Sequence, residues 1–130
     1  MHRKILVVDD EEPIVDLIKV TLNASGYDVI TASNGKEGLE KAVEELPDLI
    51  ILDVRMPVMD GFTACKNIRA NPVTANIPIV FLTASTQKAS FEKAHTSGCD
   101  YFRTKPFDPV ELSEFVNSIL RKPAVKKSGI

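Results

Sequence analysis

Polar side chains that could do chemistry follow apolar stretches at four places in the sequence. The most conspicuous is Asp53, which follows four apolar residues and precedes the turn-forming Pro57 and Gly61. An unbroken apolar run of this length is typical of a strand covered on both faces in a parallel sheet. We therefore expect Asp53 where a buried strand meets a loop, at the edge where open α/β sheets bind ligands. The other such residues are Asp9, Asp10, Thr83 and Lys105.

These residue types together indicate phosphoryl transfer. Three carboxylates in one pocket repel one another, and a hard divalent cation with oxygen ligands relieves that repulsion. Mg²⁺ is the natural candidate, because it binds a few carboxylates, keeps water and accepts phosphate oxygens as ligands. A carboxylate beside Mg²⁺ and a lysine is suited to attack phosphorus and form an aspartyl phosphate. Asp53 is the predicted acceptor, and Lys105 the predicted cation.

Each of these residues also has an ordinary structural interpretation. Asp9 and Asp10 could only cap a helix, since helix starts attract acids, and Asp53 could be a solvated loop residue. Taken alone, Thr83 is most simply a β-branched strand residue and Lys105 a surface cation. The placement of all five at strand ends favours the functional interpretation.

Five apolar segments with strand character alternate with five segments of helical periodicity. The predicted strands are residues 4–8, 27–32, 49–52, 77–83 and 100–104, and the predicted helices are 13–25, 35–46, 62–68, 86–97 and 109–120. This alternation predicts βαβ units with right-handed crossovers. The expected fold class is therefore α/β, with a doubly wound five-stranded parallel sheet and five helices on both faces. The helix at 86–97 has a thin apolar stripe, so we expect it to be the least rigid element.

Length and composition limit the classes of protein to consider. The 130 residues suffice for one domain, and residues 1–120 hold all 18 acids but only 12 of the 16 Lys and Arg. An acidic body without a basic patch predicts no direct binding of nucleic acid. No apolar run approaches the length of a membrane span, so no membrane partner is expected. Cys65 and Cys99 lack metal-ligand spacing and indicate a reducing, cytoplasmic setting.

The last ten residues differ from the rest, with four Lys and Arg and no acid. We interpret residues 122–130 as a basic flexible tail or the stub of a linker. A nucleic-acid or membrane arm is the alternative interpretation of these charges.

The motifs together resemble the receiver domain of bacterial two-component response regulators, which also occurs alone in the chemotaxis regulator. The matching segments are residues 5–10, 52–61, 81–84 and 105–107, in this order and at these spacings. The resemblance covers about residues 3–121, so we expect residues 1–121 to form a receiver domain. It implies a flavodoxin-like sheet with strand order 2-1-3-4-5.

The resemblance also implies a phosphorylation site. Asp53 would accept a phosphoryl group from the phosphohistidine of a histidine kinase or a histidine phosphotransfer protein. Asp10 and Asp53 would ligate Mg²⁺ directly and Asp9 largely through water, with the backbone carbonyl of Arg55 as the third protein ligand. Mn²⁺ is expected to substitute for Mg²⁺. Lys105 would contact the phosphoryl group.

By the same resemblance, Thr83 and Phe102 would form a switch. Thr83 would turn to bond the phosphoryl oxygen and Phe102 would turn inward with it, while the bond between Lys105 and Pro106 would be cis. The surface formed by residues 86–121 would change and bind a downstream output protein or an effector domain. The domain would not be an enzyme, because it would catalyse only its own phosphorylation and dephosphorylation.

Three other classes of protein share some of these features. A phosphatase of the haloacid dehalogenase type also uses an aspartyl nucleophile, but its Asp-x-Asp pattern needs an acid where this chain has Arg55. A nucleotide- or flavin-binding domain would need a glycine-rich loop after the first strand. A degenerate receiver would lack some of the five polar residues. Arg55 and Ser85 are expected to set the lifetime of the phosphoryl group.

Overall fold

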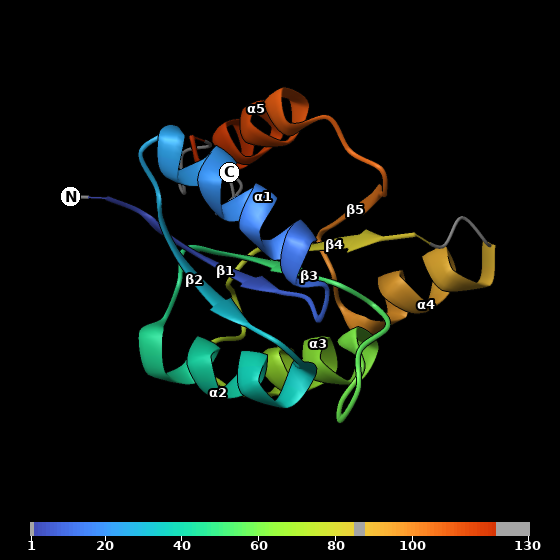
Figure 1. The fold of residues 1–130 in the computed structure, drawn as a ribbon. Helices are drawn as coiled ribbons and strands as arrows, with labels where there is room; N and C mark the ends of the chain where they lie inside the picture. Colours follow the sequence, from blue (N-terminus) through green and yellow to red (C-terminus); the bar gives the residue numbers. More distant parts are fainter. Residues whose placement is uncertain (1, 85–87, 122–130) are drawn as a thin grey trace, which may run out of the picture.

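The computed structural model describes residues 2–84 and 88–121, which form one parallel sheet with helices on both faces (Figure 1). The strands are β1 (Lys4–Val8), β2 (Asp28–Ala32), β3 (Leu49–Leu52), β4 (Ile79–Thr83) and β5 (Tyr101–Thr104). Their order is β2-β1-β3-β4-β5, and every neighbouring pair is parallel. The expected α/β class and the strand order 2-1-3-4-5 are thereby confirmed.

The helices alternate with the strands and lie in two layers. They are α1 (Glu12–Ala24), α2 (Gly35–Glu45), α3 (Gly61–Ala70), α4 (Lys88–Ser97) and α5 (Pro109–Leu120). Figure 1 shows α1 and α5 on one face of the sheet and α2 and α3 on the other. Within the described ranges, no helix combines the length and the apolar character that a bilayer span requires.

The central strands β1 and β3 are buried on both faces. Side chains alternate along a strand, so Ile50 and Leu52 point to the α2, α3 and α4 side, while Leu49 and Ile51 point to the α1 and α5 side. All four residues are at most 2% exposed. Burying one such side chain stabilises the fold by about 1.5–3 kcal/mol. Asp53 therefore directly follows a strand that is fixed by burial on both faces.

Three strands begin later than the sequence predicts: β2 begins at Asp28 rather than Tyr27, and β4 and β5 also start late. We expected β4 from Ile77, but it begins at Ile79 because Pro78 has no N–H to donate to a sheet. The Ile79 N–H donates instead to the Asp100 carboxylate at 2.9 Å, and Asp100 itself precedes β5 rather than opening it. This long-range contact joins the residues at the starts of β4 and β5, and local propensity does not encode it.

Helix α4 agrees with its weak sequence pattern where the structure describes it. Residues 86 and 87 of the predicted helix lie outside the described residues, and α4 runs from Lys88 to Ser97. Only Ala94 and Ser97 are buried in it. Little apolar contact therefore anchors this helix to the rest of the domain.

Replacing Gly61 by alanine is expected to lower the free energy of unfolding by about 1–3 kcal/mol. A Cβ at this position would lie 2.1 Å from the backbone oxygen of Asp53, so the backbone would have to shift. Alanine is otherwise the better helix residue, and propensity alone predicts a small gain in stability. Urea unfolding decides between the two signs, with the exposed Thr63→Ala in the same helix turn as control. Stabilisation by Gly61→Ala would contradict the close packing of this loop.

Candidate functional site

Asp9 and Asp53 come together because β1 and β3 are neighbours in the sheet. Val8 pairs with Leu52, so the next residue of each strand lies at the same edge. The Asp53 N–H donates to the carbonyl of Val8 at 2.9 Å, which fixes this register. Asp9 and Asp53 are only 4% and 6% exposed.

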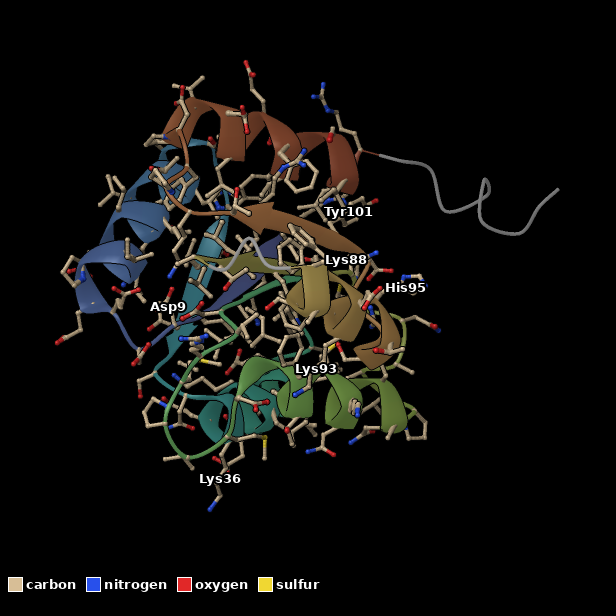
Figure 2. All side chains as sticks on the ribbon, turned by 90° about the vertical axis from the view of Figure 1, so that its right-hand side faces the viewer. Asp9, Lys36, Lys88, Lys93, His95 and Tyr101 are labelled. Atoms are coloured by element: carbon tan, nitrogen blue, oxygen red, sulfur yellow. The ribbon has the colours of Figure 1, made fainter. Side chains whose placement is uncertain are left out.

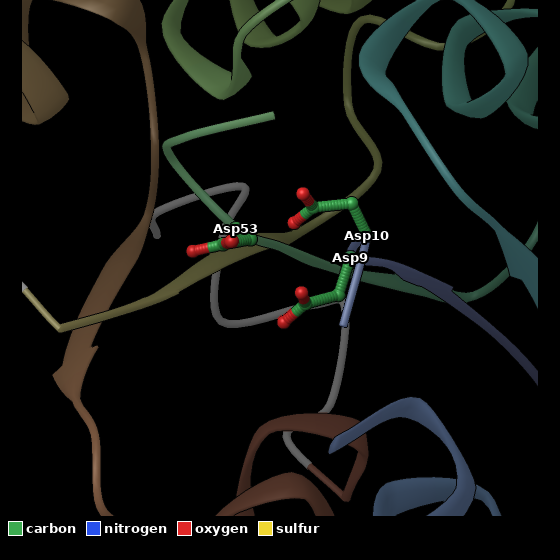
Figure 3. Close-up of side chains that lie close together, drawn as sticks. All are labelled: Asp9, Asp10 and Asp53. Atoms are coloured by element: carbon green, nitrogen blue, oxygen red, sulfur yellow. The ribbon is translucent and has the colours of Figure 1, made fainter. Parts of the chain in front are cut away.

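Three carboxylates meet at this edge. Asp9, Asp10 and Asp53 each offer an oxygen, and these oxygens lie within 4.8 Å of one another (Figure 3). Asp10 is exposed and the other two are buried, so the group opens to solvent on one side. This is the only such group of acidic, histidine and cysteine ligands in the described part of the chain.

The electrostatics of this group favour a bound cation. Burial and, to a smaller extent, the negative charge of Asp9 together raise the pKa of Asp53 from 3.8 to about 6, although Lys105 and the Val54 N–H oppose this shift. Ionised Asp53 is thus unfavourable in the folded protein without additional positive charge. Three carboxylates with one solvent-facing side match the oxygen ligands and retained water that Mg²⁺ requires. The residues present therefore fit the metal.

Lys105 supplies the positive charge of the pocket and is not a surface cation. Its Nζ lies 2.9 Å from Asp9 Oδ2, 3.0 Å from Glu11 Oε1 and 3.7 Å from Asp53 Oδ1, and its side chain is only 11% exposed. Burial alone would lower the pKa of Lys105, but its hydrogen bonds to Asp9 and Glu11 and the negative charges of Asp53 and Asp9 together more than offset this and leave the pKa raised. Lys105 is therefore charged.

The backbone near Lys105 ties it to the neighbouring strand. The Lys105 N–H donates to the carbonyl of Thr83 at 2.8 Å, and the bond between Lys105 and Pro106 is cis. Thr83 is the last residue of β4, is 2% exposed and pairs with Thr104 of β5. The carboxyl ends of β3, β4 and β5 thus lie side by side at one edge of the sheet, as the sequence predicts.

Phe102 lies in an aromatic stack on β5, between the sheet and α4. Its ring centroid is 6.4 Å from that of Phe81 and 4.3 Å from that of Phe91. Phe102 is half-buried, and Phe91 on α4 is 40% exposed. The predicted switch aromatic therefore contacts the helix with the least apolar burial.

Two residues near the site were missed or underrated by sequence reasoning. Glu11 follows the predicted Asp9 and Asp10 in sequence, and its carboxylate pairs with Lys105. Lys93 was not considered, and its Nζ lies 4.9 Å from the centre of the Phe62 ring. A cleft of about 290 Å³ between the loop after β3 and α4 is lined by Arg55 and Lys93 among others. No local pattern could reveal the contact between Phe62 and Lys93, because the two residues are 93 − 62 = 31 positions apart in the sequence.

The fold and this site define a class of protein. The chain matches the family model of the response regulator receiver domain over residues 5–117, and it therefore belongs to that family. The match covers every residue of the site described above.

Similarity to individual proteins supports membership of the receiver family. The alkaline phosphatase synthesis transcriptional regulatory protein PhoP of Bacillus subtilis is 47% identical over 125 residues, which are 96% of this chain and 51% of PhoP. The chain thus spans about half the length of this relative. The chemotaxis protein CheY4 of Vibrio cholerae has a TM-score of 0.86 at 35% identity, and the alignment covers 92% of this chain and 99% of CheY4.

A further solved structure contains a metal. It is the receiver domain of the sensor histidine kinase PA1611 of Pseudomonas aeruginosa PAO1, with a magnesium ion coordinated in its active-site cleft. Its TM-score is 0.87 at 29% identity, and the alignment covers 94% of this chain and 100% of that domain.

Proposed function

We propose that Asp53 accepts a phosphoryl group from the phosphohistidine of a histidine kinase or a histidine phosphotransfer protein. The observation that carries this proposal is the environment of Asp53. Its carboxylate is buried beside two further acids, and a charged lysine lies 3.7 Å away. Within the receiver family, such a setting suits an acyl-phosphate acceptor rather than a structural acid.

The two oxygens of Asp53 have different roles in this proposal. Oδ1 accepts a hydrogen bond from the Val54 N–H at 2.9 Å and faces Lys105, which leaves Oδ2 as the attacking atom. A bond forms between Oδ2 and phosphorus while the bond between phosphorus and the donor imidazole nitrogen breaks. The imidazole keeps the electron pair of that bond, so the transfer needs no further reactant.

Asp10, Asp53 and the backbone carbonyl of Arg55 would hold Mg²⁺, with Asp9 acting largely through water and Mn²⁺ able to substitute. The bound ion would neutralise charge on the phosphoryl oxygens during transfer. The presence of magnesium in the PA1611 receiver supports this assignment. Lys105 would keep its contact to Asp9 and would bond a phosphoryl oxygen in place of Asp53 or Glu11.

The signal would leave the site through Thr83 and Phe102. A phosphoryl group on Asp53 would draw the Thr83 hydroxyl toward it, and Phe102 would move inward with Thr83. The surface of α4, β5 and α5 would then change, because Phe102 stacks on Phe91 of α4. A downstream output protein or effector domain would bind this surface in one of its two states.

The domain would act as a signalling module that catalyses only its own phosphorylation and dephosphorylation, in the cytoplasm. Residues 1–121 would form the receiver, and residues 122–130, which lie outside the described residues, would be a basic tail or linker stub. Ser85, proposed with Arg55 to set the phosphoryl lifetime, also lies outside them. The haloacid dehalogenase alternative finds no support, since the relatives are response regulators and Arg55 occupies the place of its general acid.

Acetyl phosphate with Mg²⁺ is expected to add one phosphoryl group to the protein and to shift amide resonances in α4, β5 and α5. Intact mass spectrometry and two-dimensional NMR measure the two effects. Thr83→Ala is the matched variant, and it should still take the label but lose most of the distant shifts. Labelling that is undiminished in excess chelator would contradict the proposed site, and steady turnover of an added phosphate ester would favour a phosphatase.

A further inference from the structure

Glu11 is the N-cap residue of α1, but its side chain does not cap the helix. Its carboxylate accepts no hydrogen bond from the free N–H groups of the first turn. It lies instead 3.0 Å from the Nζ of Lys105. Within residues 2–84 and 88–121, no other group forms a hydrogen bond with this carboxylate. The Glu11 side chain therefore serves the phosphorylation site rather than the helix.

The backbone of Glu11 also contacts the site. Its N–H donates to Asp9 Oδ1 at 3.0 Å, and Lys105 donates to the other oxygen, Asp9 Oδ2, at 2.9 Å. Figure 2 shows Asp9 beside the loop that leads from β1 into α1. Glu11, Asp9 and Lys105 thus form a closed cycle of three hydrogen bonds. This cycle fixes the ammonium group of Lys105 at the carboxylates that follow β1.

Lys105 forms no hydrogen bond with Asp53 in this arrangement. Its Nζ is 3.7 Å from Asp53 Oδ1, whereas an N–H···O hydrogen bond spans about 2.7–3.2 Å. That oxygen accepts the N–H of Val54 at 2.9 Å instead. A phosphoryl oxygen on Asp53 therefore competes with two carboxylates, those of Asp9 and Glu11, for the same ammonium group.

The two carboxylates that hold Lys105 differ in what their release costs. The side chain of Asp9 is 3% exposed, whereas that of Glu11 is 59% exposed. A buried carboxylate that loses its cation finds no water to replace it, but an exposed one is hydrated at once. We propose that Glu11 is a positioning residue, which holds Lys105 in the unphosphorylated domain and releases it to the phosphoryl group on Asp53.

This role deepens the proposed function and rests on it. The contact between Glu11 and Lys105 is present before phosphorylation and absent afterwards, so it stabilises only the unphosphorylated state. Loss of the contact shifts the balance toward the phosphorylated state. Glu11 thereby sets how readily the domain accepts a phosphoryl group, although it takes no part in the bond changes at phosphorus.

Beryllofluoride, an analogue of the phosphoryl group, measures this competition without a chemical step. Its dissociation constant is determined at saturating Mg²⁺ from amide shifts in two-dimensional NMR spectra of the full chain. Glu11→Gln is expected to bind beryllofluoride about three- to fivefold more tightly than the native protein. Phosphorylation by acetyl phosphate should become faster by a similar factor.

Two further variants separate the contact from the charge. Glu11→Asp keeps the charge but is one methylene shorter, so it loses the 3.0 Å contact and should also bind beryllofluoride more tightly than the native protein. Glu12→Gln removes the neighbouring charge, which is exposed and forms no ion pair with a described residue. It should leave the affinity within about 1.5-fold of native. An equal gain in Glu12→Gln and Glu11→Gln would overturn the inference.

A double-mutant cycle shows whether Glu11 acts through Lys105. The faster phosphorylation caused by Glu11→Gln should vanish in a Lys105→Ala background, since the ammonium group that Glu11 holds is then missing. A gain that persists in this background would overturn the inference. Native-like or weaker beryllofluoride binding by Glu11→Gln would overturn it as well, while leaving the proposed function intact. A native protein that takes no phosphoryl group would overturn both.

Discussion

Replacing Asp53 by asparagine is expected to raise the free energy of unfolding by about 2 kcal/mol in metal-free buffer near about pH 7.5. Asparagine keeps the size of the side chain and an acceptor for the Val54 N–H, which donates to Asp53 Oδ1 in the native protein. It removes a charge whose burial beside Asp9 raises the pKa of Asp53 to about 6. Urea unfolding in the presence of a chelator measures the difference.

The direction of this change in stability follows from the protonation of Asp53 in the folded and unfolded states. The pKa of Asp53 is higher in the folded protein than the ordinary value of 3.8, so the folded state binds more protons between pH 3.8 and about 6. The stability that this group contributes is therefore present at low pH and is lost as the pH rises through that window. The variant lacks this loss, and the two proteins should converge below about pH 4.

Asp60→Asn is the matched control for charge removal in the same loop. Asp60 caps α3 by accepting a hydrogen bond from the Thr63 N–H, and asparagine caps a helix equally well. The control should change stability by less than about 0.5 kcal/mol. Added Mg²⁺ should raise the melting temperature of the native protein but have a much smaller effect on Asp53→Asn. A less stable Asp53→Asn protein in metal-free buffer would contradict the proposed repulsion among the three carboxylates.

Lys105→Ala is expected to slow phosphorylation by acetyl phosphate by about 10²-fold or more. Lys105 holds the one positive charge that the described structure places within 4 Å of Asp53. Without it, the charge on the transferring phosphoryl oxygens loses its protein partner, and Asp9 loses its ion pair at 2.9 Å. Rates of phosphoryl incorporation at saturating Mg²⁺ measure the effect.

Lys66→Ala provides the comparison for Lys105→Ala. Lys66 is exposed on α3 and forms no ion pair with a described residue, so this change should leave the rate within about twofold of the native protein. A rate within threefold of native for Lys105→Ala would contradict the role of its ammonium group. Circular dichroism and urea unfolding check that the slow variant is still folded under the conditions of the assay.

The position of Asp53 could be predicted because several local signals coincide there. Four buried apolar residues lead into it, and a proline and a glycine end the run, so strand, edge and loop all follow from residue type. The roles of Asp9 and Lys105 could be predicted only from the alternation of strands and helices. That alternation predicts a parallel sheet, and a parallel sheet collects strand ends at one edge. The strand order itself came from the family resemblance.

Contacts between distant segments could not be predicted in the same way. Arg69 on α3 holds the approach to β4 and β5 together, through the carbonyls of Ile77 and Gly98 and the carboxylate of Asp100. No periodicity in the sequence points to these contacts of Arg69. The pairing of Glu11 with Lys105 could likewise not be predicted, because the two residues are 94 positions apart and the pairing depends on the conformation of the loop after β1.

Locating the phosphoryl group at the level of a single residue tests the central claim most directly. The protein is treated with acetyl phosphate and Mg²⁺, the acyl phosphate is reduced with borohydride, and the modified residue is found by peptide mass spectrometry. The proposed function predicts one modified residue, Asp53, and no modification of the Asp53→Asn variant under the same conditions. Modification of Asp9, Asp10 or any other residue in the native protein, or undiminished labelling of Asp53→Asn, would contradict it.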